Sequence, residues 1–212
     1  MFPRIASLLI GYLFGIFQTA YFYGKMKGID IREHGSGNAG TTNALRVLGK
    51  KAGAIVFAGD FLKCFVVIHL VRLLFKQMAP DIMTLIALYG ATGCILGHNF
   101  PVQLNFRGGK GIACTAGLLA ALDVRIGLIA LFTFLLIVAV TRYVSLGSII
   151  IVSEFALFLI IFGQMGLYGM EQAALVEMYV LGVFLAAMAI WRHKANIVRL
   201  LNGTEHKIFS KK

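Results

Sequence analysis

Residues 5–24 read IASLLIGYLFGIFQTAYFYG, a run of twenty residues without a charged side chain. An α-helix rises about 1.5 Å per residue, so this run is long enough to cross the roughly 30 Å hydrocarbon core of a bilayer. A cleaved signal peptide has a shorter apolar region that ends at a cleavage site of small residues. We therefore expect a retained transmembrane helix at about residues 4–24.

The remaining composition is also that of a membrane protein. Of 212 residues, 59% are hydrophobic and 14% are charged, whereas soluble chains carry about a quarter charged residues. The net charge of +11 is accounted for by basic residues that flank membrane spans, and no nucleic-acid-binding signature accompanies it, so we expect no nucleic-acid partner. Three cysteines lie far apart in apolar stretches, which predicts buried thiols without disulfides.

Seven apolar segments are candidate spans. They lie at about residues 4–24, 52–75, 82–96, 109–122, 124–141, 144–162 and 173–191. The fourth is the weakest candidate, because only the eleven residues from Ile112 to Leu122 separate Lys110 from Asp123. That length covers about half of the hydrocarbon core.

The distribution of Lys and Arg indicates whether the fourth segment crosses. If it does, one face of the membrane carries fifteen of these residues and the other four, with Lys63 inside a span; if it turns back, the split is nine against ten. The positive-inside rule favours the first arrangement. We therefore predict an all-α polytopic membrane protein with seven transmembrane helices, the N-terminus outside, the C-terminus cytoplasmic, and a single domain over residues 1–212.

Three polar, glycine-rich segments interrupt the apolar chain, at residues 35–46, 97–111 and 192–196. The seven-span arrangement places all three on the cytoplasmic face. Irregular backbone at the edge of a bilayer persists only where it is buried in protein or lines a wet cavity. Glycines let the main chain approach a ligand, and adjacent Lys and Arg suit an anion. Together these segments predict a site for a phosphorylated or carboxylated molecule.

The first segment has the features of a phosphate cradle. Thr41 or Thr42 is expected to cap a short helix that runs to about Leu48 and ends at Gly49. The helix N-terminus and the Ser36 hydroxyl suit an anion, and Arg46 adds a bidentate donor. The alternative is an ordinary loop. The crowding of hydrogen-bonding side chains favours a site; the remaining candidates are Gly37, Asn38 and Asn43.

The second segment repeats this arrangement. Gly108, Gly109, Lys110 and Gly111 lead directly into the apolar fourth segment, so their amides and the Lys110 ammonium suit an anion at the membrane boundary. The spacing is not that of a P-loop, so we do not expect nucleotide binding at this segment. His98 is either part of the polar wall of the site or an interfacial residue.

Four further residues are candidates outside these loops. His193 and Asn196 share a face if the last helix continues past Trp191. Alone, a histidine at a helix end is more often a cap, and the tail at residues 204–207 reads as solvated. Asp60 and Lys63 lie one turn apart inside the second span, where ionisable groups are costly unless paired. They form either a structural ion pair or a connection to the cytoplasmic site.

Several reaction classes lack their signatures. The histidines and cysteines show no HExxH or CxxC spacing, so we expect no metal and no cofactor. There is no Gly-x-Ser-x-Gly elbow, which argues against a serine acyl-enzyme. The His-x4-Asp signature of the common soluble and peripheral glycerolipid acyltransferases is also absent.

These motifs, taken in order, resemble the bacterial acyl-phosphate-dependent glycerol-3-phosphate acyltransferases, over almost the whole chain. The similarity is carried by residues 35–46, by Asp60-Phe61-Leu62-Lys63, by Gly97-His98-x-x-Pro101 through Gly111, and by Arg192-His193-x-x-Asn196 through Glu205. It implies a seven-helix inner-membrane enzyme of the bacterial cell, with its site facing the cytoplasm. In such enzymes the serine and arginine of the first motif and the histidine and asparagine of the third are associated with activity. The glycines of the second are associated with glycerol 3-phosphate.

The implied reaction moves a fatty acyl group from acyl phosphate to glycerol 3-phosphate, giving 1-acylglycerol 3-phosphate and inorganic phosphate. This is the first acylation of phospholipid synthesis, and the soluble enzyme that makes acyl phosphate is an expected partner. Phosphate is already a good leaving group, so positioning and charge neutralisation supply catalysis. Either His193 or a substrate phosphate accepts the proton. The alternatives are a small transporter of an organic phosphate, which should show repeat symmetry, and a lipid-binding scaffold.

Overall fold

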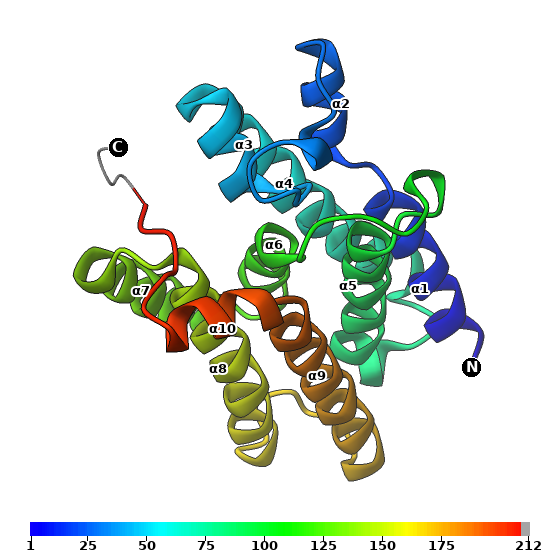
Figure 1. The fold of residues 1–212 in the computed structure, drawn as a ribbon. Coiled ribbons are helices and arrows are strands. Elements are labelled where there is room, and N and C mark those ends of the chain that lie inside the picture. Colours follow the sequence, from blue (N-terminus) through cyan, green and yellow to red (C-terminus); the bar gives the residue numbers. More distant parts are fainter. Residues whose placement is uncertain (209–212) are drawn as a thin grey trace. The chain divides into compact units, whose positions relative to one another are not determined.

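The computed structural model describes residues 1–208, which form α-helices, short 3-10 helices and loops (Figure 1). Within this range six helical segments are long and apolar enough to cross a membrane: Phe2–Met26, Lys50–Phe75, Pro80–Leu104, Val124–Thr141, Val144–Gln164 and Gln172–Arg192. The fourth predicted span, over residues 109–122, corresponds to a shorter apolar helix, Ile112–Leu122. The predicted all-α, polytopic class is therefore confirmed.

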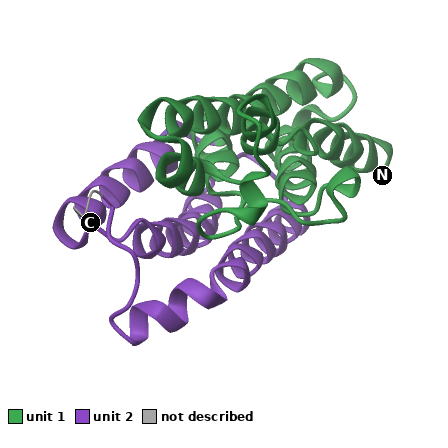
Figure 2. Cartoon of the chain, turned by 45° about the horizontal axis from the view of Figure 1, so that its top comes forward, with its two compact units in different colours: residues 1–122 green, residues 123–212 purple. Residues whose placement is uncertain are grey.

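The chain forms two compact units, Met1–Leu122 and Asp123–Lys212 (Figure 2). We describe each unit by itself. The single domain expected over residues 1–212 stays a prediction.

Unit 1 is a bundle of α1 (Phe2–Gly15), α4 (Lys50–Phe75), α5 (Met83–Asn99) and α6 (Ile112–Leu122). Helix α5 packs against α1, α4 and α6. Shorter elements connect these helices: α2 (Thr19–Met26), η1 (Ile31–Glu33), α3 (Thr41–Leu48), η2 (Pro80–Ile82) and η3 (Val102–Leu104). The core of this bundle therefore lies along α5, whose last turn carries His98.

Glycines bring α1 and α5 unusually close together. A Cβ on Gly11 would lie 1.9 Å from the carbonyl oxygen of Gly90, and one on Gly93 would lie 2.0 Å from that of Leu8. Gly11 and Gly15 of α1, and Gly93 and Gly97 of α5, are pairs of small residues spaced four apart. Such pairs let two helices approach closely, and here they serve helix packing within the chain.

The first span is interrupted, contrary to the continuous helix expected over residues 4–24. Helix α1 ends at Gly15 and α2 begins at Thr19. The carbonyl oxygens of Gly15 and Phe17 accept hydrogen bonds from Lys63 Nζ, at 3.2 and 2.7 Å. A broken helix persists at membrane depth where protein groups satisfy the backbone that the break exposes. Lys63 is such a group, which the local sequence pattern does not reveal.

Helix α6 begins at Ile112, three residues later than expected, because residues 109–111 are irregular and Gly111 has a φ of +82°. Its C-terminal carbonyls are satisfied by Arg72 of α4. The guanidinium donates to the oxygen of Ala121 at 2.7 Å and to that of Leu122 at 3.1 Å. The end of α6 thus lies level with the last turn of α4.

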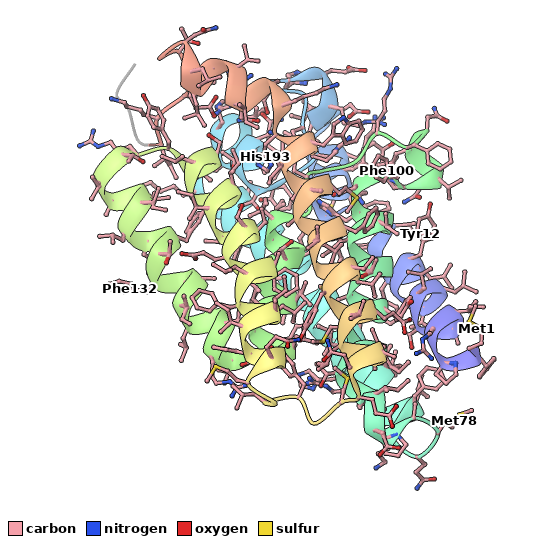
Figure 3. The ribbon with its side chains drawn as sticks, turned by 90° about the horizontal axis from the view of Figure 1, so that it is seen from below. Met1, Tyr12, Met78, Phe100, Phe132 and His193 are labelled. Atoms are coloured by element: carbon pink, nitrogen blue, oxygen red, sulfur yellow. The ribbon has the colours of Figure 1, made fainter. Side chains whose placement is uncertain are left out.

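Unit 2 consists of α7 (Val124–Thr141), α8 (Val144–Gln164), α9 (Gln172–Arg192) and α10 (Lys194–Leu201), with α8 packed against α7 and α9. The last three predicted spans agree with these helices to within two residues. Phe132 points away from α7 and is 70% exposed (Figure 3). Exposed apolar side chains along a helix of this length are typical of a surface that faces lipid.

Glu154 finds its partner within unit 2. Its Oε1 accepts a hydrogen bond from Thr133 Oγ1 of α7 at 3.0 Å. The contact joins α7 to α8 through polar side chains inside an otherwise apolar pair of helices.

Candidate active site

Asn43 organises the first glycine-rich segment from within. Its Oδ1 accepts from the Ser36 amide at 2.8 Å, and its Nδ2 donates to the carbonyls of Ile31 and His34 at 3.1 and 2.9 Å. The loop curls over this buried side chain because Gly35 and Gly37 have φ values of +62° and +69°. A Cβ on Gly35 would also lie only 2.4 Å from Asn43 Oδ1.

Helix α3 follows this loop and ends at Gly49, as predicted, but its N-cap is Gly40 and no side chain caps it. The expected capping by Thr41 or Thr42 is therefore wrong. The Thr41 hydroxyl is buried and has no hydrogen-bond partner among residues 1–208. Ser36, Gly37, Thr42 and Arg46 are exposed, and Asn38 is half-buried. The loop therefore presents most of the predicted polar groups at its surface.

The second segment lies against the last turn of α5. The amide of Gly108 donates to the carbonyl of Asn99 at 3.3 Å, and that of Gly109 donates to the carbonyl of His98 at 3.1 Å. These two amides, expected to serve an anion, are thus used to fix the loop to α5. The first N–H groups of α6 have no partner within their own helix, and Lys110 is half-buried beside them.

Unit 1 brings the first and second segments together. A Cβ on Gly109 would lie 2.8 Å from the carbonyl oxygen of Ala39. Arg32, which precedes the first loop, donates from Nη1 to the carbonyl of Leu104 at 3.3 Å. Its hydrogen bonds to Asp30, at 2.7 Å from Nη2, hold the pKa of that carboxyl at about 2. The expectation of one composite site is supported for these two segments.

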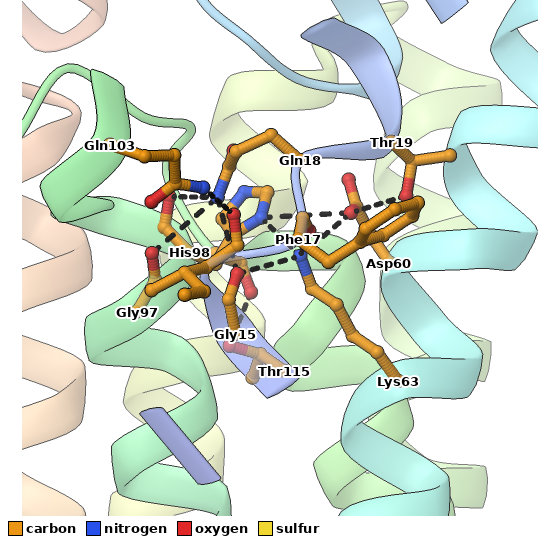
Figure 4. A network of polar contacts seen from close by, with 12 residues as sticks. Gly15, Phe17, Gln18, Thr19, Asp60, Lys63, Gly97, His98, Gln103 and Thr115 are labelled. Atoms are coloured by element: carbon orange, nitrogen blue, oxygen red, sulfur yellow. Dashed lines mark hydrogen bonds and ion pairs between the residues drawn. The ribbon is translucent and has the colours of Figure 1, made fainter. Parts of the chain in front are cut away.

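A buried group of polar side chains lies beneath the second segment (Figure 4). Lys63 Nζ is 2.9 Å from Asp60 Oδ1 and 2.9 Å from His98 Nδ1. Thr19 Oγ1 donates to Asp60 Oδ1 at 3.0 Å. Gln18, fully buried, donates from Nε2 to the carbonyls of Gly15 and His98 at 3.2 and 3.1 Å.

The structure bears on both alternatives for Asp60 and Lys63. The predicted ion pair is present, and Lys63 also contacts His98 at the base of the second segment. A role of the pair in the site stays a prediction.

The three cysteines are free and fully buried, as expected. They are far apart in sequence and lie on α4, α5 and α6, three helices that pack against one another. In the part of the chain that the structure describes, no cluster of His, Cys, Asp and Glu has the arrangement of a metal site.

The third segment lies in unit 2, where His193 separates α9 from α10. Its buried ring makes a 2.7 Å hydrogen bond from Nδ1 to the carbonyl of Ala189. Since a carbonyl only accepts, Nδ1 carries a proton, and in the neutral ring the lone pair is then on Nε2. Asn196, on α10, donates from Nδ2 to Glu205 Oε1 at 2.7 Å.

The expectation of a solvated tail at residues 204–207 is wrong for Glu205, whereas Thr204, His206 and Lys207 are exposed. The Glu205 carboxylate also accepts from Ser145 Oγ at 2.8 Å and from Arg199 Nε at 2.7 Å. Burial disfavours its charged form, but these hydrogen bonds and the Arg199 charge hold the pKa of Glu205 below its ordinary value. Glu205 therefore fixes α10 and the Asn196 side chain.

Three functional candidates escaped the sequence analysis: Gln18, Thr19 and Glu205. Gln18 could have been identified from the sequence, since a side-chain amide inside a membrane span must find hydrogen-bond partners. Glu205 could not readily be identified in this way, because its hydrogen-bond partners are spread along the chain from Ser145 to Arg199. All predicted site residues other than His193 and Asn196 lie in unit 1.

The fold and the site define an integral membrane protein whose glycine-rich loops, hydroxyls and basic residues suit a phosphate-bearing ligand. The model of the glycerol-3-phosphate acyltransferase family matches residues 5–203. A glycerol-3-phosphate acyltransferase of Clostridioides difficile (strain 630) is 42% identical over 214 residues, covering 100% of this chain and 98% of the relative. One of Thermoanaerobacter sp. (strain X514) is 39% identical, covering 98% and 96%.

Two solved structures have the same fold. Both are of PlsY, described as an integral membrane glycerol 3-phosphate acyltransferase, and both are 35% identical to this chain, covering 97% of it and 95% of PlsY. The glycerol 3-phosphate form gives a TM-score of 0.83, and the lysophosphatidic acid form one of 0.80. The chain belongs to the glycerol-3-phosphate acyltransferase family, and is thus an acyltransferase of lipid biosynthesis.

Proposed function

We propose that this enzyme transfers a fatty acyl group from acyl phosphate to glycerol 3-phosphate in the first acylation step of phospholipid synthesis. The observation that carries the proposal is the meeting of two glycine-rich segments in unit 1, where residue 109 lies against the carbonyl of Ala39. Two substrates that each carry a phosphate require two anion sites next to each other. The soluble enzyme that makes acyl phosphate is the proposed partner.

The reaction needs no covalent enzyme intermediate. The 1-hydroxyl oxygen of glycerol 3-phosphate attacks the carbonyl carbon of the acyl phosphate, the bond from that carbon to the phosphate oxygen breaks, and inorganic phosphate leaves. The products are 1-acyl-sn-glycerol 3-phosphate and phosphate. The enzyme has to hold two anions near each other and neutralise their charge, which positioning and preorganised donors achieve.

In this proposal the first segment binds a phosphate through Ser36, Arg46 and the orphaned hydroxyl of Thr41. A buried hydroxyl without a hydrogen-bond partner destabilises the protein. A ligand oxygen that hydrogen-bonds to the Thr41 hydroxyl therefore removes a destabilising feature of the unliganded loop. Gly37, Asn38, Thr42 and Asn43 complete the segment, with Asn43 keeping its shape. Ser36 and Arg46 are the proposed catalytic groups here, since both are exposed.

The second segment binds a phosphate through Lys110, the first amides of α6 and Gly111. Gly108 and Gly109 contribute by having no side chain, because a Cβ at either would overlap His98. In the third segment His193 accepts the proton of the attacking hydroxyl. In the neutral ring the proton on Nδ1 leaves Nε2 with the lone pair that a general base needs, and Asn196, three residues further along the chain, is held by Glu205.

Purified protein is expected to use acyl phosphate and little or no acyl-CoA. Acyl phosphate presents a compact dianion at the reacting carbonyl, whereas the phosphates of CoA lie on a nucleotide for which the chain has no fingerprint. The measurement is incorporation of radiolabelled glycerol 3-phosphate into lipid with each donor. Inorganic phosphate should compete with the acyl donor.

Variants give this test its control. Ser36→Ala and Arg46→Ala should lose most of the activity with acyl phosphate, while Lys27→Ala, which removes an exposed basic side chain outside the motifs, should retain it. Efficient turnover of acyl-CoA by a preparation free of phosphate-transferring contaminants would contradict the proposed donor.

We also propose seven spans, with the N-terminus outside and the glycine-rich segments on the cytoplasmic face of the bacterial inner membrane. Helix α6 is short, but its C-terminus lies level with Arg72 near the end of α4. Its preceding loop extends from the His98 contact with Lys63, in the middle of α4, to Ala39 of the first segment, which precedes α4 in the chain. An irregular segment followed by a short helix therefore supports a complete crossing.

Labelling with a membrane-impermeant thiol reagent is expected to reach Arg4→Cys from outside the cell. Lys50→Cys and Lys207→Cys should react only after the membrane is opened. Cys64, Cys94 and Cys114 are fully buried and provide the unreactive background. Labelling of Lys207→Cys from outside intact cells would favour six spans.

A further inference from the structure

His98 is held between a buried ammonium group and the second glycine-rich segment. The residue is 3% exposed, and its Nδ1 lies 2.9 Å from Lys63 Nζ. The other ring nitrogen, Nε2, faces the loop: a Cβ on Gly109 would lie 2.1 Å from it. The two nitrogens of one imidazole thus face two different environments.

The contacts of Lys63 determine which nitrogen carries the ring proton. The carbonyls of Gly15 and Phe17 can only accept hydrogen bonds, and the Asp60 carboxylate stabilises the charged form of Lys63. The Lys63 side chain is therefore an ammonium, which has donors and no lone pair. A proton on His98 Nδ1 would point at one of these donors across 2.9 Å. The other acceptor near Nδ1 is Asp60 Oδ1 at 3.6 Å, which is beyond hydrogen-bonding distance. We therefore infer that Nδ1 offers its lone pair to Lys63 and that the ring proton is on Nε2.

We propose that Lys63, held by Asp60, keeps His98 as the Nε2–H tautomer, and that His98 donates from Nε2 to a substrate phosphate at the Gly108–Gly111 loop. Lys63 and Asp60 are then positioning residues that act through His98. This inference rests on the proposed function, because it uses the loop as a phosphate site. It adds three buried residues, His98, Lys63 and Asp60, to the residues of the glycine-rich segments that the proposed function uses.

The surrounding contacts fix the histidine from several elements. Thr19 of α2 donates to Asp60, and Gln18 donates to the His98 carbonyl at 3.1 Å. The same carbonyl accepts from the Gly109 amide, so the main chain of His98 is tied to the loop that its ring faces. A neutral donor in a fixed position stabilises an anion without reorganisation when the substrate binds.

His193 has the opposite arrangement. Its Nδ1 donates to the carbonyl of Ala189, which in the neutral ring leaves the lone pair on Nε2. The two histidines of the motifs therefore differ in the polarity that Nε2 presents, a donor in His98 and an acceptor in His193. That difference matches a phosphate-binding role for the first and a proton-accepting role for the second.

The direct test is nitrogen NMR of protein labelled with ¹⁵N-histidine, which has five histidines in its sequence. The His98 signals are assigned by their loss in His98→Gln. We expect a protonated Nε2 and an unprotonated Nδ1 in the unliganded protein. Adding glycerol 3-phosphate alone, or acyl phosphate alone, should shift the Nε2 signal, and the arm that shifts it identifies which phosphate binds there; glycerol should not.

Two substitutions at His98 distinguish the effect of the hydrogen-bond donor's position from the effect of side-chain packing. The amide nitrogen of Gln reaches the position of Nε2, whereas that of Asn reaches only the position of Nδ1. His98→Asn should raise the KM for the substrate identified by NMR about 10- to 100-fold, the value of a hydrogen bond to a charged group. His98→Gln should raise it by less, and kcat should change little in either. Lys63→Gln should convert the His98 signals to a mixture of tautomers.

Three results would overturn the proposal: a protonated Nδ1 in the wild-type protein, an Nε2 signal that neither phosphate shifts, or equal KM values in His98→Asn and His98→Gln. The first measurement needs no variant, so it stands even if Lys63→Gln fails to fold. The tautomer is read without turnover, whereas the choice of acyl donor is read from turnover alone. Failure of this inference and failure of the proposed donor are therefore distinguishable.

Discussion

Asp60→Asn is expected to destabilise the protein by about 3 kcal/mol or more, because it leaves the Lys63 ammonium buried without its counter-ion. Asp60 is 1% exposed and its carboxylate lies 2.9 Å from Lys63 Nζ. At about 2–4 °C per kcal/mol for a chain of this size, the apparent Tm in detergent should fall by about 6–12 °C. The control is Asp81→Asn, which neutralises an exposed carboxylate and should leave the Tm unchanged.

The double variant Asp60→Asn with Lys63→Met shows whether the loss comes from the unpaired charge. Removing both charges should recover much of the Tm, since a buried pair replaced as a whole costs less than one partner removed. We expect the double variant to use its phosphate-bearing substrates poorly even when its Tm is recovered, because His98 no longer contacts the Lys63 ammonium. A double variant no more stable than Asp60→Asn would show that the ion pair is not the source of the effect.

Gly109→Ala is expected to lower kcat/KM about 100-fold while the bundle still forms. The new methyl group would lie 2.1 Å from His98 Nε2 and 2.8 Å from the Ala39 carbonyl, so the loop has to move away from both. Overpacking of this kind costs about 1–3 kcal/mol, and each 1.36 kcal/mol lost from transition-state stabilisation is a factor of ten in rate. The loss should be larger for the substrate whose phosphate binds this loop.

Gly24→Ala is the matched control for this substitution. It also adds a methyl group to a buried glycine of unit 1, but the closest atom would be the Ile29 carbonyl oxygen at 3.2 Å. Its kcat/KM should stay within a few-fold of wild type. If Gly109→Ala were as active as Gly24→Ala at equal Tm, the packing of residue 109 against His98 would have no part in substrate binding.

The sequence alone determined the class of this protein. Uncharged runs long enough to span a bilayer are a local property, so the positions of α4, α7, α8 and α9 follow from composition. The glycine-rich motifs are local as well, and they identified the loops at residues 35–46 and 97–111. The helix from Thr41 to Leu48 and its end at Gly49 were also predictable, because glycine at a helix end is a short-range signal.

Tertiary structure alone decided how the polar groups are partnered. Lys63 meets His98 across 35 residues, and Gln18 meets the His98 carbonyl across 80. Partners at such separations leave no periodic pattern in the chain. The break after Gly15 is decided in the same way: its exposed carbonyls are tolerated because Lys63, on another helix, donates to them. Local composition specifies which segments enter the membrane, whereas the satisfaction of buried polar groups specifies how they are shaped there.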